Sequence, residues 1–419
     1  MNATDFLHTV PSGGVTSAQG FKAGGIHAGF RRNPERFDMA LVEADELCSA
    51  AGLFTQNVFC AAPVVVSREH LDTLGYGLAR AVVINSGNAN AATGPVGLEV
   101  ARKTANIVAD AVGCAAEDVL VASTGVIGQL LDITPFVDAV PTLHARLDRA
   151  GGTDAANAIM TTDTQVKEGA VSYASADPVY GGTTFTVGGM AKGSGMIMPD
   201  MATMIAVVTT DAPVAPEALH AALRAASAVS FNKVTVDSDT STNDTCFLLA
   251  SGKAAPAGAP AIRQNTPAFE EFTRALTVVC QDLARKMARD GEGATKLITV
   301  TVKGAASAED ADKAARSVAN SPLVKTAVFG HDANWGRIAM ALGKSGASFE
   351  QNRVSIDIMG IPVCRDGLTV DFSEEEALRR FELPEITLEA DLGAGSAETT
   401  VWTCDFSHEY ITINGDYRT

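Results

Sequence analysis

The chain has 419 residues, of which 46% are hydrophobic and 19% charged, the balance of a folded protein with two or three packed units. Its formal net charge of −17 would repel a polyanion, and no basic stretch interrupts it. Binding to nucleic acid or to an anionic membrane surface is therefore not expected.

No apolar run approaches the ~20 residues that a membrane helix needs, and the N-terminus lacks the basic and apolar regions of a signal peptide. The seven cysteines are scattered and never form a C-x-x-C pair. They predict reduced, mostly buried thiols in a cytoplasmic protein without a zinc site.

Strands and helices alternate along the first half of the chain. Short Val-rich runs predict buried strands at 39–42, 62–66, 81–84 and 118–122. A helix is predicted over 96–112, where apolar residues recur near helical spacing. The region 80–125 therefore has the pattern of a strand–helix–strand unit.

After a Gly-rich stretch, helices are predicted at 215–229 and 267–289, the second with apolar residues at spacings of three and four. The C-terminal part is predicted to mix strands with helices. The strands are expected at 297–303, 353–358, 385–391 and 398–404, and the helices at 308–318 and 334–342. The polar segment 290–295 suggests a boundary between a domain of residues 1–290 and a smaller one of residues 291–419.

A loop containing glycines and Pro199 leads into a predicted strand at Thr203. There, the Thr203 hydroxyl could attack the carbonyl of Ala202, giving an ester that water would split into two chains. The freed α-amino group has a reference pKa of ~7.7–8.0 and could take the hydroxyl proton. One residue would supply nucleophile and base. The alternative is that Thr203 only begins a strand, as β-branched residues do.

Several ordered motifs resemble those of the ornithine acetyltransferase family, also called the glutamate N-acetyltransferase family of arginine biosynthesis. They are GGVTSAQGFKAGGIHAGF near the start, NSGNANAATG at 85–94, STGVIG at 123–128, AIMTTD at 158–163, STNDT at 241–245, EGATK at 292–296, SPLVKTA at 321–327, ANWGRI at 333–338 and the final NGDYRT. The resemblance extends over nearly the whole chain.

The resemblance implies a split between Ala202 and Thr203, giving chains 1–202 and 203–419, and an oxyanion hole at Thr124 and Gly125. It assigns substrate binding to Thr161, Lys192, Thr203, Glu292, Asn414 and Thr419. In such a site, Lys192 would pair with a carboxylate, Glu292 with an ammonium and Asn414 with either.

Without the resemblance, simpler assignments hold: Ser123–Gly125 as a strand-ending turn, Lys192 as an exposed lysine in a Gly loop, Glu292 as a helix-terminal acid, and the C-terminus as a disordered tail. Other polar residues in matching motifs are assigned structural roles: Asp237, Asp239, Asn243 and Asp332.

The family further implies a mixed α/β protein, an αββα sandwich of stacked mixed sheets with a smaller C-terminal α/β domain whose tail returns to the site. Its reaction is a ping-pong transfer of acetyl from N-acetylornithine to Thr203 and then to glutamate, with no metal or organic cofactor. Bifunctional members also accept acetyl-CoA, which the residues do not decide. The two cleaved chains are expected to form an α2β2 assembly.

Two other functions remain as alternatives. A self-cleaving aminopeptidase or amidase would share the fold and the nucleophile, but would release the acyl group as free acid instead of transferring it to a second amino acid. A non-catalytic amino-acid-binding regulator would remain one intact chain.

Overall fold

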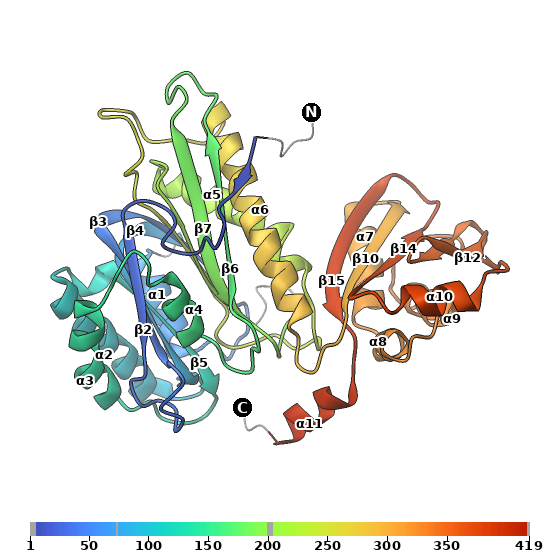
Figure 1. Ribbon diagram of the computed structural model, residues 1–419, viewed down its shortest axis with the longest axis horizontal. Helices are drawn as coiled ribbons and strands as arrows, with labels where there is room; N and C mark the ends of the chain where they lie inside the picture. The colour runs from blue at the N-terminus through green and yellow to red at the C-terminus, as the bar shows by residue number, and fades with distance from the viewer. Residues whose placement is uncertain (1–5, 73, 199–203, 417–419) are drawn as a thin grey trace.

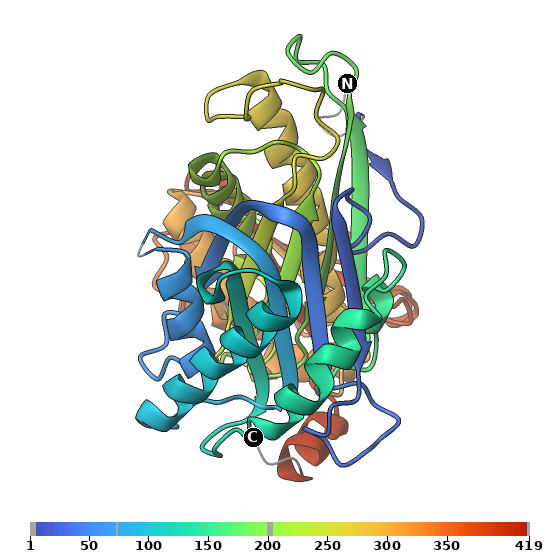
Figure 2. The same cartoon turned by 90° about the vertical axis from the view of Figure 1, so that its left-hand side faces the viewer.

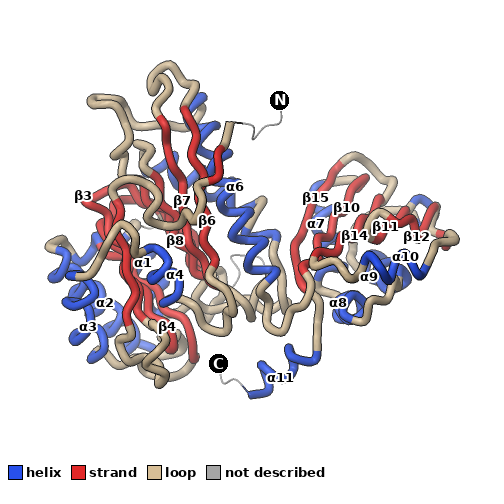
Figure 3. Tube along the Cα trace, viewed as in Figure 1, coloured by secondary structure: helices blue, strands red, loops and turns tan. Residues whose placement is uncertain are grey.

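The computed structural model describes residues 6–72, 74–198 and 204–416. Figures 1 and 3 show two parts, each built on one β-sheet with helices against it. No described helix is long and apolar enough to cross a membrane.

The first part holds a mixed sheet in the order β1-β6-β7-β8-β9-β3-β4-β5, with β2 paired to β3. Within the described ranges, its strands are β1 (His8–Thr9), β2 (Phe21–Ile26), β3 (Met39–Phe54), β4 (Tyr76–Asn88), β5 (Val119–Val126), β6 (Lys167–Ala174), β7 (Thr184–Lys192), β8 (Ile205–Thr210) and β9 (Thr245–Ala250).

This sheet folds over itself along β3, whose register shifts between Glu43 and Cys48. Before the shift β3 pairs with β2 and β4, and beyond it with β4 and β9. Side chains of β2–β5 share one buried cluster with side chains of β7–β9, for example Val82 with Phe247. The two halves of the sheet therefore pack face to face as the two inner layers of a sandwich.

Helices cover both outer faces. On the face of β3–β5 lie α1 (Ala62–His70), α2 (Gly94–Val112) and α3 (Thr134–Ala145), which share a second buried cluster with these strands. On the face of β6–β9 lie α5 (Pro216–Ala228) and α6 (Pro267–Arg289), over a third cluster. Figure 2 shows α2 and α3 in front of the strands and α6 behind them. The expected αββα architecture is confirmed, with α4 (Gly152–Ala158) packed beside β2.

The second part is a mixed sheet in the order β13-β12-β11-β14-β10-β15 with its own buried cluster. Its strands are β10 (Leu297–Ala305), β11 (Ser355–Ile358), β12 (Ile361–Arg365), β13 (Leu368–Thr369), β14 (Glu385–Asp391) and β15 (Ala397–Cys404). Its helices are α7 (Ala308–Ala319), α8 (Pro322–Phe329), α9 (Trp335–Gly343) and α10 (Glu374–Arg380). Helix α11 (His408–Asp416) follows β15 and extends back beneath the first part (Figure 1).

The strand predicted at 62–66 is wrong, because these residues begin α1. Pro63 lies in the first helical turn, where its missing N–H costs nothing. The polar end of the segment continues the helix, and the Ser67 hydroxyl both donates to the carbonyl of Val121 (2.7 Å) and accepts from its N–H (2.8 Å). This bond to β5 fixes the helix to the sheet and overrides the strand preference of the valines.

Candidate active site

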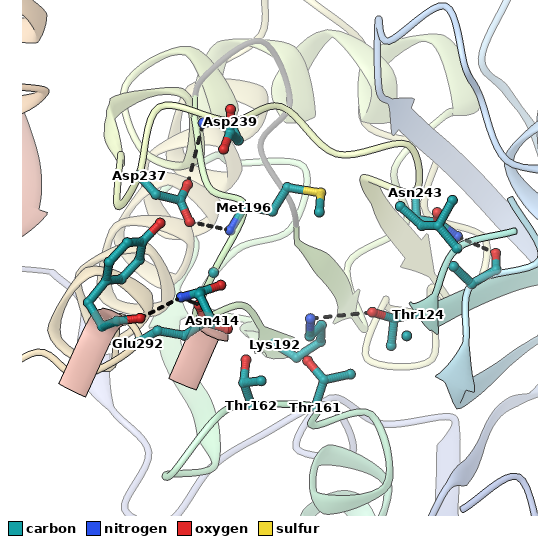
Figure 4. Close-up of a pocket in the computed structure, with 15 residues that line it drawn as sticks. Thr124, Thr161, Thr162, Lys192, Met196, Asp237, Asp239, Asn243, Glu292 and Asn414 are labelled. Carbon is teal, nitrogen blue, oxygen red and sulfur yellow. Dashed lines mark hydrogen bonds between the residues drawn. The ribbon is translucent and has the colours of Figure 1, made fainter. Parts of the chain in front are cut away.

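A pocket lies where the ends of several strands meet the turn after α6 and the tail helix α11 (Figure 4). The residues that line it are Ala89, Thr124, Gly125, Ile127, Thr161, Thr162, Lys192, Gly195, Met196, Asp237, Asp239, Asn243, Glu292, Tyr410 and Asn414. It contains every described residue that the family resemblance assigned to the oxyanion hole or to substrate binding.

Three of the assigned residues, Ala202, Thr203 and Thr419, lie outside the described part of the chain. Strand β8 begins at Ile205, two positions beyond Thr203, and Ile205 pairs with Lys192 of β7. The segment that follows the expected cleavage point therefore enters the central sheet beside a residue of the pocket. The roles assigned to individual residues stay predictions.

Thr124 and Gly125 lie at the end of β5, where its parallel pairing with β4 becomes irregular around Gly87 and Asn88. Gly125 has φ of +131°, and a Cβ there would come within 2.3 Å of the carbonyl carbon of Gly87. Only glycine fits such a position. The amide of Asn243 donates to the carbonyl oxygens of Ala89 (2.6 Å) and Ser123 (2.8 Å), which holds the two strand ends together.

Lys192 is a buried cation at the end of β7, so the alternative of an exposed lysine in a Gly loop is wrong. Its Nζ lies 3.4 Å from the hydroxyl oxygen of Thr124, and Figure 4 shows the two groups facing each other. Burial lowers the pKa of the Lys192 ammonium, an effect that Asp163 opposes most strongly. A carboxylate entering the pocket would compensate this buried charge.

A buried chain of alternating charges lies behind Lys192. Lys167 donates to Asp163 Oδ1 (2.7 Å) and to Asp290 Oδ2 (2.5 Å), and all three side chains are buried. Although burial favours protonated Asp163, the ammonium groups of Lys192 and Lys167 hold the pKa of that carboxyl well below its usual range. Behind the pocket, two lysines therefore alternate with two aspartates.

Glu292 is buried in the turn after α6, and its N–H donates to the carbonyl oxygen of Ser194 (3.0 Å). Its carboxylate accepts a hydrogen bond from the side-chain amide of Asn414 (2.8 Å). Next in the chain, Gly293 has φ of +68°, and a Cβ there would lie 2.5 Å from the N–H nitrogen of Tyr410. This close approach seats α11 against the turn, so the alternative of a disordered tail is wrong for residues 408–416.

Asp237 supports the loop that precedes the expected cleavage point. Its carboxylate accepts from the N–H groups of Met196 (2.6 Å) and Ile197 (2.8 Å). Burial raises the pKa of Asp237 to about 6, in spite of these bonds. Asp237 and Asn243 thus have the structural roles expected for them, and they also line the pocket, as Asp239 does. Asp332 lies elsewhere, where it accepts from Asn334 (3.1 Å).

Asp244 is fully buried and accepts from the N–H of Met204 (3.1 Å) through one carboxylate oxygen, whereas its other oxygen has no hydrogen-bond partner among the described residues. Burial raises the pKa of this carboxyl well above its usual range. The residue was missed at the sequence level although its motif, STNDT, was recognised. Asp163 was missed in the same way within AIMTTD, and nothing in the local pattern marked Lys167 or Asp290.

The pocket suits a small zwitterion. An ammonium and a hydroxyl lie on one side, at Lys192 and Thr124, and carboxylates lie on the other, at Glu292 and Asp237. Opposite charges at the two ends can fix the orientation of an amino acid. Among the described residues, no group of His, Cys, Asp and Glu side chains is arranged to hold a metal ion.

Comparison with known proteins gives consistent matches. The sequence profile of the ArgJ family matches residues 22–419. The chain is 49% identical to the arginine biosynthesis bifunctional protein ArgJ of Symbiobacterium thermophilum over 97% of its own length and 99% of that protein. It is 48% identical to the protein of the same name from Chlorobaculum tepidum, over 96% of both chains.

Among solved structures, the arginine biosynthesis bifunctional protein argJ from Bacillus halodurans is 40% identical. The match has a TM-score of 0.48 and covers 50% of this chain and 97% of the other. The sequence relatives, which span almost the full chain, confirm the family resemblance inferred from the motifs.

Proposed function

The chain belongs to the ArgJ family and is an acyltransferase of arginine biosynthesis, and we propose that it moves the acetyl group of N-acetylornithine to glutamate through an ester on Thr203. Before it can act, the chain splits between Ala202 and Thr203. The Thr203 hydroxyl attacks the Ala202 carbonyl, the peptide bond becomes an ester, and water releases chain 1–202 and the new N-terminus of chain 203–419.

In the first half of the cycle, the Thr203 Oγ attacks the acetyl carbonyl of N-acetylornithine. The α-amino group of Thr203 takes the hydroxyl proton and passes it to the leaving amine of ornithine. In the second half, the neutral amine of glutamate attacks the ester, its proton returns through the α-amino group to the Thr203 oxygen, and N-acetylglutamate leaves. The Thr124 hydroxyl and the Gly125 N–H stabilise the negative oxygen in both steps, a contribution of about 3–4 kcal/mol per donor.

One observation carries the proposal: residues from β5, β7, the turn after α6 and helix α11 meet in one pocket, with an ammonium and a hydroxyl opposite carboxylates. Lys192 suits the carboxylate of an amino acid, and Glu292 with Asn414 suits its ammonium. The reaction as written needs no metal or organic cofactor. We further propose that the two chains stay associated, in an α2β2 assembly.

The test has two parts. Intact-mass measurement of purified protein should give chains 1–202 and 203–419, Thr203→Ala should give one uncut chain, and Thr203→Ser, which keeps a hydroxyl, should still split. With N-acetylornithine and glutamate, N-acetylglutamate should form faster than free acetate. A single intact chain with full activity, or acetate as the main product, would overturn the proposal in favour of a regulator or a hydrolase.

The sequence relatives are named bifunctional proteins, which suggests acetyl-CoA as a second donor of the acetyl group. Acetyl-CoA supplied with glutamate alone should yield N-acetylglutamate if this chain shares that property. If wild type forms N-acetylglutamate from acetyl-CoA no faster than Thr203→Ala does, N-acetylornithine remains the acetyl donor of this enzyme.

A further inference from the structure

We propose that Asp163 is a positioning residue that joins two walls of the pocket and balances the charge of Lys192. It does not line the pocket itself. The inference rests on the proposed function, because it gives Lys192 the task of binding the carboxylate of an amino-acid substrate.

The geometry comes from three hydrogen bonds to one buried carboxylate. Asp163 Oδ2 accepts from the N–H of Thr161 (2.9 Å), and Oδ1 accepts from the N–H of Gly193 (2.7 Å). Thr161 belongs to the loop after α4, and Gly193 follows Lys192 at the end of β7. Asp163 therefore fixes the backbone on both sides of the pocket where substrate residues are expected.

The third bond sets the charge. Lys167 contacts both Asp163 and Asp290, and the charge of Asp163 also acts on Lys192, whose neighbour Gly193 it binds. Asp290 is itself held by the N–H groups of Thr164 (3.0 Å) and Gln165 (3.3 Å). Because Asp290 also neutralises Lys167, Asp163 can stabilise the second ammonium, that of Lys192.

The charged groups that act electrostatically on Lys192 are Asp163, Lys167, Asp244 and Glu292. Burial lowers the pKa of Lys192, Asp163 raises it most, and Lys167 lowers it further. Changing Asp163 or Lys167 should therefore move the pKa of Lys192 in opposite directions. If the Asp163–Lys167 ion pair were only structural, the two changes would not shift the pKa of Lys192 in opposite directions.

The experiment compares Asp163→Asn with Lys167→Gln in steady-state transfer assays over a range of pH. Loss of the Asp163 charge should move the alkaline limb of kcat/KM for glutamate down by about one pH unit, whereas loss of the Lys167 charge should move it up. In Asp163→Asn, the new NH₂ group replaces an oxygen that accepted from a backbone N–H, so two donors face each other and one backbone bond is lost. The KM for glutamate should therefore rise about tenfold.

Asp211→Asn is the matched control. Asp211 is equally buried and accepts from the N–H groups of Thr186 (2.7 Å) and Gln19 (3.0 Å), but it does not line the pocket. It should lose stability without shifting the alkaline limb. If Asp163→Asn is insoluble, Asp163→Glu takes its place, because it keeps the negative charge but displaces the carboxylate from the N–H groups of Thr161 and Gly193. Its KM for glutamate should rise while the alkaline limb stays near the wild-type position, and an unchanged KM would overturn the positioning role.

Two results would overturn the inference: limbs that move in the same direction in both variants, or a shift in Asp163→Asn no larger than in Asp211→Asn. Failure of the proposed function is distinguished by the wild-type protein, which would then show no transfer at any pH. In that case glutamate affinity, measured by calorimetry across the same pH range, tests the charge balance at Lys192 alone.

Discussion

The side-chain amide of Asn414 donates a hydrogen bond to the carboxylate of Glu292 over 2.8 Å, although the two residues are 122 positions apart. The contact links α11 to the turn that follows α6. Upstream of α11, the ammonium of buried Lys325 lies 4.4 Å from the ring centroid of Phe406 and donates to the hydroxyl of Thr403 (2.7 Å). The C-terminal tail is thus held both at Phe406, before α11, and at Asn414, within it, and it forms one wall of the pocket.

Replacing Asn414 by alanine should weaken substrate binding. The change removes the amide on α11 that donates to the Glu292 carboxylate. We expect a loss of about 1.4 kcal/mol of binding free energy, equivalent to a tenfold rise in KM, with kcat little changed. Steady-state kinetics measure it. Thr412→Ala is the control on the same helix, because within the described ranges the Thr412 hydroxyl bonds inside α11, to the carbonyl of His408 (3.3 Å). Equal KM values in the two variants would contradict the role of the Glu292 contact.

Gly195→Ala should disable the site without unfolding the protein. A Cβ at position 195 would lie 2.4–2.5 Å from the carboxylate atoms of Glu292. Because these atoms lie at the end of a flexible side chain, the Glu292 side chain can rotate away without unfolding the protein. Its carboxylate would then leave the pocket. We expect kcat/KM to fall at least about tenfold.

The matched glycine is Gly343, at the end of α9, where a Cβ would meet no atom of the described residues within 4 Å. Gly343→Ala should keep full activity and gain up to about 1 kcal/mol in the free energy of unfolding. Parallel measurements of activity and urea unfolding separate the two effects. Unaltered kcat/KM in Gly195→Ala would show that the position of the Glu292 carboxylate does not matter.

Thr124→Val should slow catalysis more than it affects binding. The substitution keeps the shape of the side chain and removes the hydroxyl that faces Lys192. If this hydroxyl stabilises the oxyanion, kcat should fall roughly 100-fold or more while KM changes little. Thr124→Ser retains the hydroxyl and should remain within a fewfold of wild type. A loss confined to KM would instead assign Thr124 to substrate binding.

The stability of the protein should depend on pH through Asp237. Burial raises the pKa of this carboxyl to about 6 from its ordinary value of 3.8, so the folded chain binds more protons than the unfolded chain between these values. The free energy of unfolding should therefore decline as the pH rises from about 4 to about 6, and this contribution should stay constant above it.

Asp237→Asn should lack that decline, whereas substitution of its exposed neighbour, Asp239→Asn, should retain it. Urea unfolding at several pH values from 4 to 7 measures both. Curves for wild type and Asp237→Asn that stay parallel across this range would sink the assignment.

Local sequence pattern predicted helices best where an apolar face repeats over many turns. Helix α6 begins and ends at the predicted residues, 267 and 289, because Phe272, Leu276 and Leu283 all lie on its buried face. The pattern failed at 62–66, where a run of valines favours a strand and the bond from Ser67 to β5 decides for a helix.

The motifs alone nominated the described site residues that the fold gathers into one pocket, from Thr124 to Asn414. They did not nominate Lys167 or Asp290, because an ion pair between residues 123 positions apart leaves no mark in either local segment. Nor did they nominate Asp163, whose carboxylate binds the distant N–H of Gly193. The need for glycine at 125 likewise depends on how closely Gly87 of the neighbouring strand approaches.

The sequence by itself determined the family, the mixed α/β class and the chemistry available, since these depend on which residues are present and in what order. Only the tertiary structure decided which side chains are buried and which charges face one another. The physical reason is that the charge state of Lys192 depends on desolvation and on charged neighbours from three other segments, and these become neighbours only when the sheet folds over and α6 ends beside it.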